Sequence, residues 1–239
     1  MGVDGGSLGE GSRYRGPWIS LVTSAFYPTE TFGGLASAGR MPILPPVLVF
    51  ALGMMAFTLL NLEEIIAIVS VQISASSDLP PEAAGAALRF AKVSAVVGSA
   101  AGVLGFFLVG LVLGFIGLFL GSPASLRQLF SLAGYSMTFP LLLQSAIRAV
   151  MVRVFPSLTP QTVLTSAALL LPPESAGTFT YGLLSGLDLF GVWVLAVMVV
   201  GYSRLTGFST KKAATVLITL WVAFLLGGAA LSTLAPAVR

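Results

Sequence analysis

The chain has 239 residues, of which 56% are hydrophobic and only 9% are charged, with a net charge of +3. With a mean hydropathy of +0.97, this apolar excess must face lipid, so the composition excludes a soluble globule or a nucleic-acid-binding domain and predicts an integral membrane protein. The chain contains no cysteine and no histidine, which excludes disulfides, Cys/His zinc sites, thiolate nucleophiles and histidine general bases.

The N-terminal part of the chain predicts a tail followed by short helices in the membrane interface. Residues 1–16 are rich in Gly and Ser and lack the apolar run of a cleavable signal peptide, so we expect a disordered tail. From Pro17 to Phe26, apolar residues recur at i, i+3, i+4, i+7 and i+8, which places them on one face of a helix. A second short segment covers residues 29–40, and we assign residues 17–43 to the interfacial segment.

Residues 44–239 predict an all-α transmembrane domain of five helices. Each span is a run long enough to cross the ~30 Å hydrocarbon core, and all are free of charge except the fourth, which is interrupted only by Asp188. The spans are expected at about Pro45–Leu62, within Val93–Leu126, at Gln128–Ile147, at Leu183–Tyr202 and within Ala213–Leu234. The second span belongs to a longer helix that opens at Pro80 and Pro81. Between Phe155 and Gly182 the apolar core is too short to span, so this segment is expected to lie on the surface or to re-enter partway.

The distribution of Lys and Arg favours an N-terminus inside and a C-terminus outside. With this orientation, seven of the 12 Lys and Arg residues fall on the inner side and five on the outer side. The short loop from Arg204 to Lys212 carries three cations and no acid. The fold class predicted is therefore a polytopic membrane protein with five transmembrane helices, N-in/C-out, preceded by short interfacial helices.

One group of polar residues is expected to form an intramembrane cluster. Asp188 lies inside the predicted fourth span, and a carboxylate at that depth normally has a partner. In the N-in orientation the residues at comparable depth are Glu63, Glu64, Gln144 and Arg148. We favour a structural ion pair between Arg148 and Asp188, with a proton-responsive, ion-responsive or headgroup site as the alternative.

Two further patterns concern helix packing. Glycines four residues apart in the second span allow close approach of helix backbones; the candidates are Gly98, Gly102, Gly110 and Gly114. Pro140 removes one backbone donor from the third span, so a kink is expected near Gly134 and Tyr135. No pattern predicts a catalytic residue, a metal ligand or a cofactor site.

Three sequence segments carry a resemblance to a known family. They are PTETF at Pro28–Phe32, RQLFSLAGYSMTFP ending at Pro140, and LDLFGVWVLAVMVVGYSRLTGFSTKKA through the fourth span. In their order, from about Pro28 to Phe224, they resemble the bacterial branch of the Yip (Ypt/Rab-interacting protein) domain family of membrane proteins. The resemblance implies a cytoplasmic N-terminal region followed by five closely spaced helices; eukaryotic relatives act in membrane traffic with small GTPases.

The function expected from this resemblance is that of a non-enzymatic scaffold or adaptor of the membrane-organising or trafficking type. The alternative is a small transporter or channel with a polar site near Asp188. No cofactor is expected. The expected partners are the lipid bilayer and either another membrane protein or a second copy of the chain, with no nucleic acid, and the expected location is the cell membrane, the inner membrane in a bacterium.

Reporter fusions after Gly16 and at Arg239 test the predicted topology. Because five spans separate these positions, the two reporters are expected on opposite sides of the membrane, with Gly16 in the cytoplasm. Alkaline phosphatase activity reports the outer side and green fluorescence the inner side. The same reporter active at both positions would contradict the topology.

Overall fold

The computed structural model describes residues 16–37, 41–75, 80–155, 165–175 and 177–233. Its helical elements are α1 (Pro17–Phe26), α2 (Pro28–Ser37), α3 (Leu44–Leu60), α4 (Leu62–Ala75), α5 (Pro81–Ala101), α6 (Leu104–Leu120), α7 (Leu126–Val154), η1 (Ala167–Leu170), η2 (Pro173–Ser175), α8 (Phe179–Gly186), α9 (Leu189–Thr206) and α10 (Thr210–Ser232). The only other regular feature within the described residues is an antiparallel bridge between Ser166 and Asp188. The all-α prediction is confirmed, whereas the predicted tail, apart from Gly16, lies outside the described residues.

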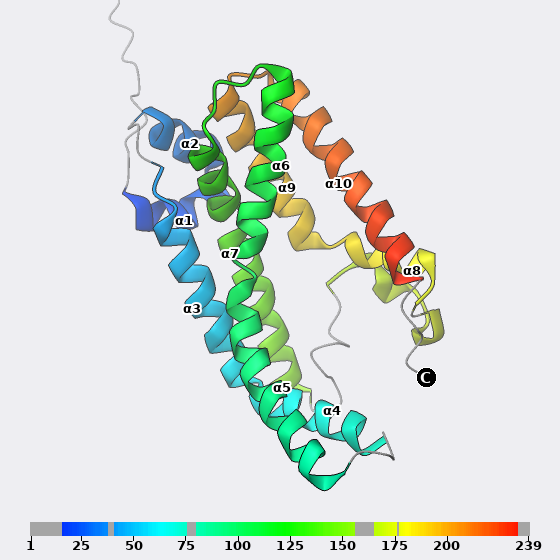
Figure 1. Ribbon diagram of the computed structural model, residues 1–239. Helices are drawn as coiled ribbons and strands as arrows, with labels where there is room; N and C mark the ends of the chain where they lie inside the picture. Colours follow the sequence, from blue (N-terminus) through cyan, green and yellow to red (C-terminus); the bar gives the residue numbers. More distant parts are fainter. Residues whose placement is uncertain (1–15, 38–40, 76–79, 156–164, 176, 234–239) are drawn as a thin grey trace, which may run out of the picture.

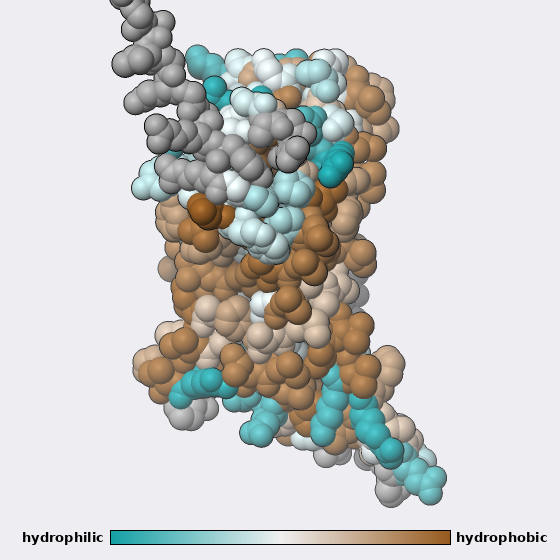
Figure 2. Space-filling model, turned by 90° about the vertical axis from the view of Figure 1, so that its left-hand side faces the viewer, coloured by the Kyte–Doolittle hydropathy of each residue, from teal (hydrophilic) through white to brown (hydrophobic). Residues whose placement is uncertain are grey.

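Long apolar helices make up the body of the molecule. Within the described residues, four helical spans are long and apolar enough to cross a membrane, and the number rises to five if the bent pair of α3 and α4 is counted as one broken span. Figure 1 shows α3, α5, α6 and α7 running along one axis, with α9 and α10 beside one half of it. On the face drawn in Figure 2, apolar residues form a belt between two hydrophilic zones. The chain is therefore a multi-pass membrane protein.

A bend of 61° separates α3 from α4. At the bend, Asn61 donates from Nδ2 to the Phe57 carbonyl at 2.7 Å, and Arg153 of α7 donates to the Leu60 carbonyl at 2.8 Å. These bonds satisfy carbonyl groups at the end of α3, where no further helical turn is available. The sequence left open whether the residues after Glu64 extend the first span, and the structure turns them aside as α4.

The fourth span begins later than the sequence predicts. The predicted start at Leu183 is wrong, because α8 ends at Gly186 and a new helix, α9, begins at Leu189. Asp188 is the N-cap of α9, and its Oδ1 accepts hydrogen bonds from the backbone N–H groups of Phe190 at 2.8 Å and Gly191 at 3.2 Å. A carboxylate in this position satisfies N–H groups that have no partner within the helix. Asp188 therefore starts the span and does not lie inside it.

The helices α1 and α2 lie across one end of the bundle (Figure 1). Ser24 Oγ donates to the Tyr135 carbonyl of α7 at 2.8 Å, and Trp193 Nε1 of α9 donates to the Ala25 carbonyl at 3.0 Å. The apolar face predicted for α1 is divided. Leu21 and Ala25 are buried against the bundle, whereas Trp18, Val22 and Phe26 are exposed.

The core at this end depends on close contact between α2 and α9. Phe32 and Leu35 of α2 are fully buried. Opposite them, α9 carries Gly201, where an added Cβ would lie 2.9 Å from the Phe32 ring and would collide with Leu132 of α7. The absence of a side chain at Gly201 lets three helices meet at one point, which fixes α2 against the spans.

The glycines of the second span differ in their surroundings. An added Cβ at Gly110 would collide with the Phe130 ring and would lie 3.0 Å from the Phe130 Cα, and one at Gly114 would collide with Leu126. At Gly102 the nearest atom, in the Phe50 ring, would be 3.0 Å away, and at Gly98 nothing lies within 4 Å. Close packing of α6 on α7 therefore occurs at Gly110 and Gly114, and Gly98 takes no part in it.

Gly110→Leu is expected to destabilise the bundle by about 1–3 kcal/mol or to prevent its assembly, because the Phe130 backbone leaves no room for a side chain. Thermal unfolding in detergent measures the effect. The matched control is Gly98→Ala in the same span, which should lose no stability because alanine favours a helix and the site is open. Leu108→Ala should also have a small effect, since Leu108 is 58% exposed. An unchanged unfolding temperature for Gly110→Leu would contradict the packing.

Candidate functional site

A polar network joins α7 to the segment that precedes α9. Gln144 Nε2 donates to Thr165 Oγ1 at 2.7 Å and to Asp188 Oδ2 at 2.9 Å. The Thr165 hydroxyl donates to the same carboxylate oxygen, and Arg148 Nη2 donates to Thr165 Oγ1 at 3.4 Å. The structure therefore brings together three of the five residues predicted for the cluster, with Thr165 at their centre.

Backbone pairing holds Thr165 and Asp188 side by side. The Leu189 N–H donates to the Thr165 carbonyl at 3.3 Å, and the Ala167 N–H donates to the Leu187 carbonyl at 3.0 Å. One carboxylate thus has two tasks, since Oδ1 caps α9 while Oδ2 accepts the side chains of Gln144 and Thr165. The network fastens the start of α9 to the middle of α7.

The direct ion pair expected between Arg148 and Asp188 is not formed in the described part of the chain. Both side chains contact Thr165 Oγ1, which stands between them. The expectation placed Asp188 within a helical span facing α7. The capping geometry instead directs one oxygen at α9 and leaves the other to Thr165 and Gln144. Sequence reasoning missed Thr165, and its only signal was a hydroxyl within the segment between Phe155 and Gly182.

The two remaining residues of the predicted cluster lie elsewhere. Glu63 and Glu64 are in the first turn of α4, where a negative charge is favourable at a helix N-terminus. Glu63 is exposed, and Oε2 of the partly buried Glu64 has no hydrogen-bond partner. Neither side chain contacts the network of Gln144, Thr165 and Asp188.

Residues around the predicted kink are used for packing. α7 remains one helix from Leu126 to Val154 with Pro140 inside it. Gly134 faces α3, where an added Cβ would lie 2.9 Å from Pro46, and Tyr135 is fully buried and donates from its hydroxyl to the Pro17 carbonyl at 3.2 Å. Helices α3 and α1 therefore pack against α7 at Gly134 and Tyr135.

An open cavity of about 140 Å³ lies between α3, α4 and α7. Its lining residues include Met54, Thr58, Asn61, Ser145, Arg148 and Ala149. Arg148 therefore reaches the polar network with one end and lines the cavity as well. Asn61, the single asparagine of the chain, was also missed by sequence reasoning, although an isolated amide between Leu60 and Leu62 is an unusual residue at the end of a span.

The arrangement offers hydrogen bonding and one positive charge, and the hydrogen bonds of its described residues pair no nucleophile with a general base. Within the described residues, no group of three or more His, Cys, Asp or Glu is placed to hold a metal ion. The network binds polypeptide segments together, and Arg148 is the network residue that also lines the cavity.

Comparison with known families agrees with this architecture. A family model described as the Yip1 domain matches residues 22–231, which covers α2 to α9 entirely and nearly all of α10. The chain belongs to the Yip domain family. No curated protein and no solved structure matches the chain. In this Yip-domain protein the three segments that carry the resemblance have clear structural tasks, since they supply Phe32 of α2, Tyr135 of α7 and the Asp188 cap of α9.

Asp188→Asn and Thr165→Val are each expected to lower the stability of this Yip-domain protein. Thr165→Val removes the hydroxyl that donates to the carboxylate, and Asp188→Asn leaves one acceptor oxygen, so the cap of α9 and the Thr165 hydroxyl no longer have separate acceptors. Since both changes disturb the same contact, the double variant should lose less than the sum, with a coupling of about 0.5–3 kcal/mol. Unfolding in detergent measures all three variants.

Arg148→Gln should couple more strongly to Thr165→Val than to Asp188→Asn, because Thr165 stands between the charged groups. Glu63→Gln is the matched control, since it neutralises an exposed carboxylate outside the network. Strict additivity of Thr165→Val and Asp188→Asn would rule out the network as a stabilising unit.

Proposed function

We propose that this Yip-domain protein is a non-enzymatic scaffold or adaptor in the cell membrane of a bacterium, with α1 and α2 on the cytoplasmic side. The observation that carries the proposal is the firm attachment of α1 and α2 to the bundle. A surface that is already ordered loses little conformational entropy when a partner binds. Family membership supports the same assignment.

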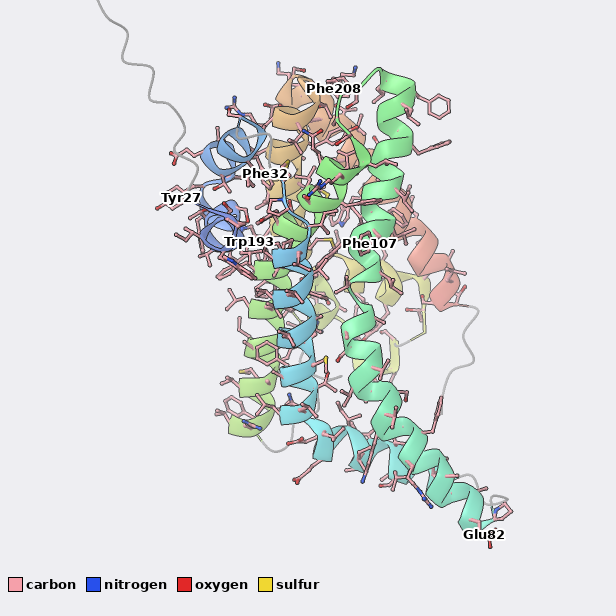
Figure 3. All side chains as sticks on the ribbon, turned by 60° about the vertical axis from the view of Figure 1, so that its left-hand side comes forward. Tyr27, Phe32, Glu82, Phe107, Trp193 and Phe208 are labelled. Atoms are coloured by element: carbon pink, nitrogen blue, oxygen red, sulfur yellow. The ribbon has the colours of Figure 1, made fainter. Side chains whose placement is uncertain are left out.

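The proposed partner surface is called the platform here and consists of the outer side of α1 and the turn that follows it. Its exposed residues are Trp18, Ile19, Val22, Phe26 and Tyr27. Figure 3 places Tyr27 at the outer edge of this end, with Phe32 and Trp193 nearby and Glu82 at the opposite end of the molecule. Exposed aromatic side chains of this kind are enriched at protein interfaces, so the partner expected is another membrane protein or a second copy of the chain.

The use of the polar residues supports a role without catalysis. Asp188 is occupied by the cap of α9, Gln144 and Thr165, and no described group is placed to activate a nucleophile beside it. A small transporter or channel is the second candidate, because an open cavity lies beside the same network and shares Arg148 with it. Flux in proteoliposomes that is lost in a stable Asp188→Asn variant would favour this second candidate.

Site-specific photocrosslinking in the native membrane tests the platform. A photoreactive phenylalanine replaces Tyr27, which is 58% exposed, or, as a matched control, Phe90, which is 75% exposed on α5. The proposal expects a discrete protein adduct at position 27 that reciprocal capture from the partner reproduces, and no such adduct at position 90. Lipid labelling alone at both positions would contradict it.

The same experiment is repeated in a Phe32→Ala background, because Phe32 is the buried anchor of α2. Loss of this anchor should weaken the adduct at position 27, whereas Phe115→Ala, which removes a ring that is 64% exposed, should leave it unchanged. Equal adduct formation in both backgrounds would show that partner binding does not depend on the attachment of the platform to the bundle.

A further inference from the structure

Two residues that line the cavity between α3, α4 and α7 each have a buried polar atom without a hydrogen-bond partner. Asn61 is only 8% exposed, and its Oδ1 has no partner while its Nδ2 donates to the Phe57 carbonyl. Arg148 Nε is likewise buried and without a partner. Both residues line the same open cavity of about 140 Å³. Buried polar atoms are almost always paired, so an unpaired acceptor and an unpaired donor on two residues that line one cavity make this cavity a candidate ligand site.

The Arg148 guanidinium has no carboxylate in direct contact. None of the described residues that line the cavity is acidic, and the Thr165 hydroxyl stands between the guanidinium and Asp188. A partly buried charge without a directly paired opposite charge favours an anion placed beside it. A guanidinium with free donors matches a phosphate group in particular, because its N–H groups bond phosphate oxygens at a fixed angle.

The remaining lining favours an amphipathic ligand. Phe57, Ile65 and Val152 supply apolar walls next to the polar atoms. A volume of about 140 Å³ holds several waters at ~30 Å³ each, enough for a phosphate and a short polar group and too small for a whole lipid. The cavity is open, so acyl chains remain outside in the bilayer. It lies at the bend where α3 ends, and in Figure 1 this bend is at the end of the molecule opposite the platform.

We propose that this cavity binds the headgroup of a phospholipid whose headgroup carries a hydrogen-bond donor as well as a phosphate. Arg148 binds the phosphodiester, and Asn61 Oδ1 accepts a hydrogen bond from a headgroup hydroxyl or ammonium. Phosphatidylglycerol and phosphatidylethanolamine have such a donor, whereas phosphatidylcholine does not. The inference is independent of the proposed scaffold function, because it uses a different end of the molecule and a different ligand.

Native mass spectrometry of the full chain released from nanodiscs tests the proposal. The nanodiscs contain phosphatidylcholine with an equal amount of phosphatidylglycerol or phosphatidylethanolamine. The wild-type protein is expected to retain the donor-bearing lipid in preference to phosphatidylcholine. Arg148→Gln should reduce lipid retention by about tenfold or more, since a hydrogen bond to a charged group contributes at least one decade of affinity. Asn61→Ala should remove the preference between headgroups and keep binding of phosphate.

Two further variants separate binding from folding. Ala149→Met fills the cavity from a buried lining position without touching Thr165 or Asp188, and it should abolish retention in a folded protein. Arg127→Gln is the matched control, since this exposed arginine lies in the first turn of the same helix, outside the cavity lining, and should keep normal retention. Thermal unfolding of each variant in detergent verifies that it is folded.

The outcomes are distinct. Equal lipid retention by the wild-type protein, Arg148→Gln and Ala149→Met would overturn the site. Retention that depends on Arg148 but is equal for all three headgroups would overturn the role of Asn61. Inorganic phosphate that displaces the lipid and stabilises only proteins with Arg148 would identify a soluble phosphate as the ligand and overturn the lipid.

Discussion

A bilayer offers no water to backbone groups, so every interruption of a helix inside it must be satisfied by the protein itself. This constraint explains where the polar side chains of the chain are found. Asp188 caps the first N–H groups of α9, and Asn61 and Arg153 bond the last carbonyl groups of α3. These polar residues therefore lie at the breaks in the helices because the backbone groups there need hydrogen-bond partners.

The constraint also links the break before α9 to the rest of the bundle. Because one oxygen of Asp188 caps the helix, the other is available to Thr165 and Gln144. The same few bonds thus start a span, close the preceding segment and fasten both to α7. Arg148 bonds Thr165 instead of the carboxylate, and the same arginine lines the neighbouring cavity.

Small residues play the corresponding role for apolar packing. Gly201 admits Phe32 and Leu132, and Gly110 admits Phe130, so that short and long helices approach closely without a hydrophobic driving force between them. At the platform end this packing holds a surface proposed to receive a protein. At the other end the bend of α3 leaves a cavity proposed to receive a lipid headgroup. The two proposals concern opposite ends and separate chemistries.

The sequence by itself determined the membrane class, the five apolar runs, the short helix at Pro17–Phe26 and the family, because these depend on composition, periodicity and local order. It also indicated that Asp188, Gln144 and Arg148 belong together, since depth along a span follows from residue count. Only the tertiary structure decided that Thr165 stands between Arg148 and Asp188, that Gly110 is packed while Gly98 is open, and that Asn61 faces a cavity. These features depend on which helix faces which, and that pairing is set by contacts between residues far apart in the chain.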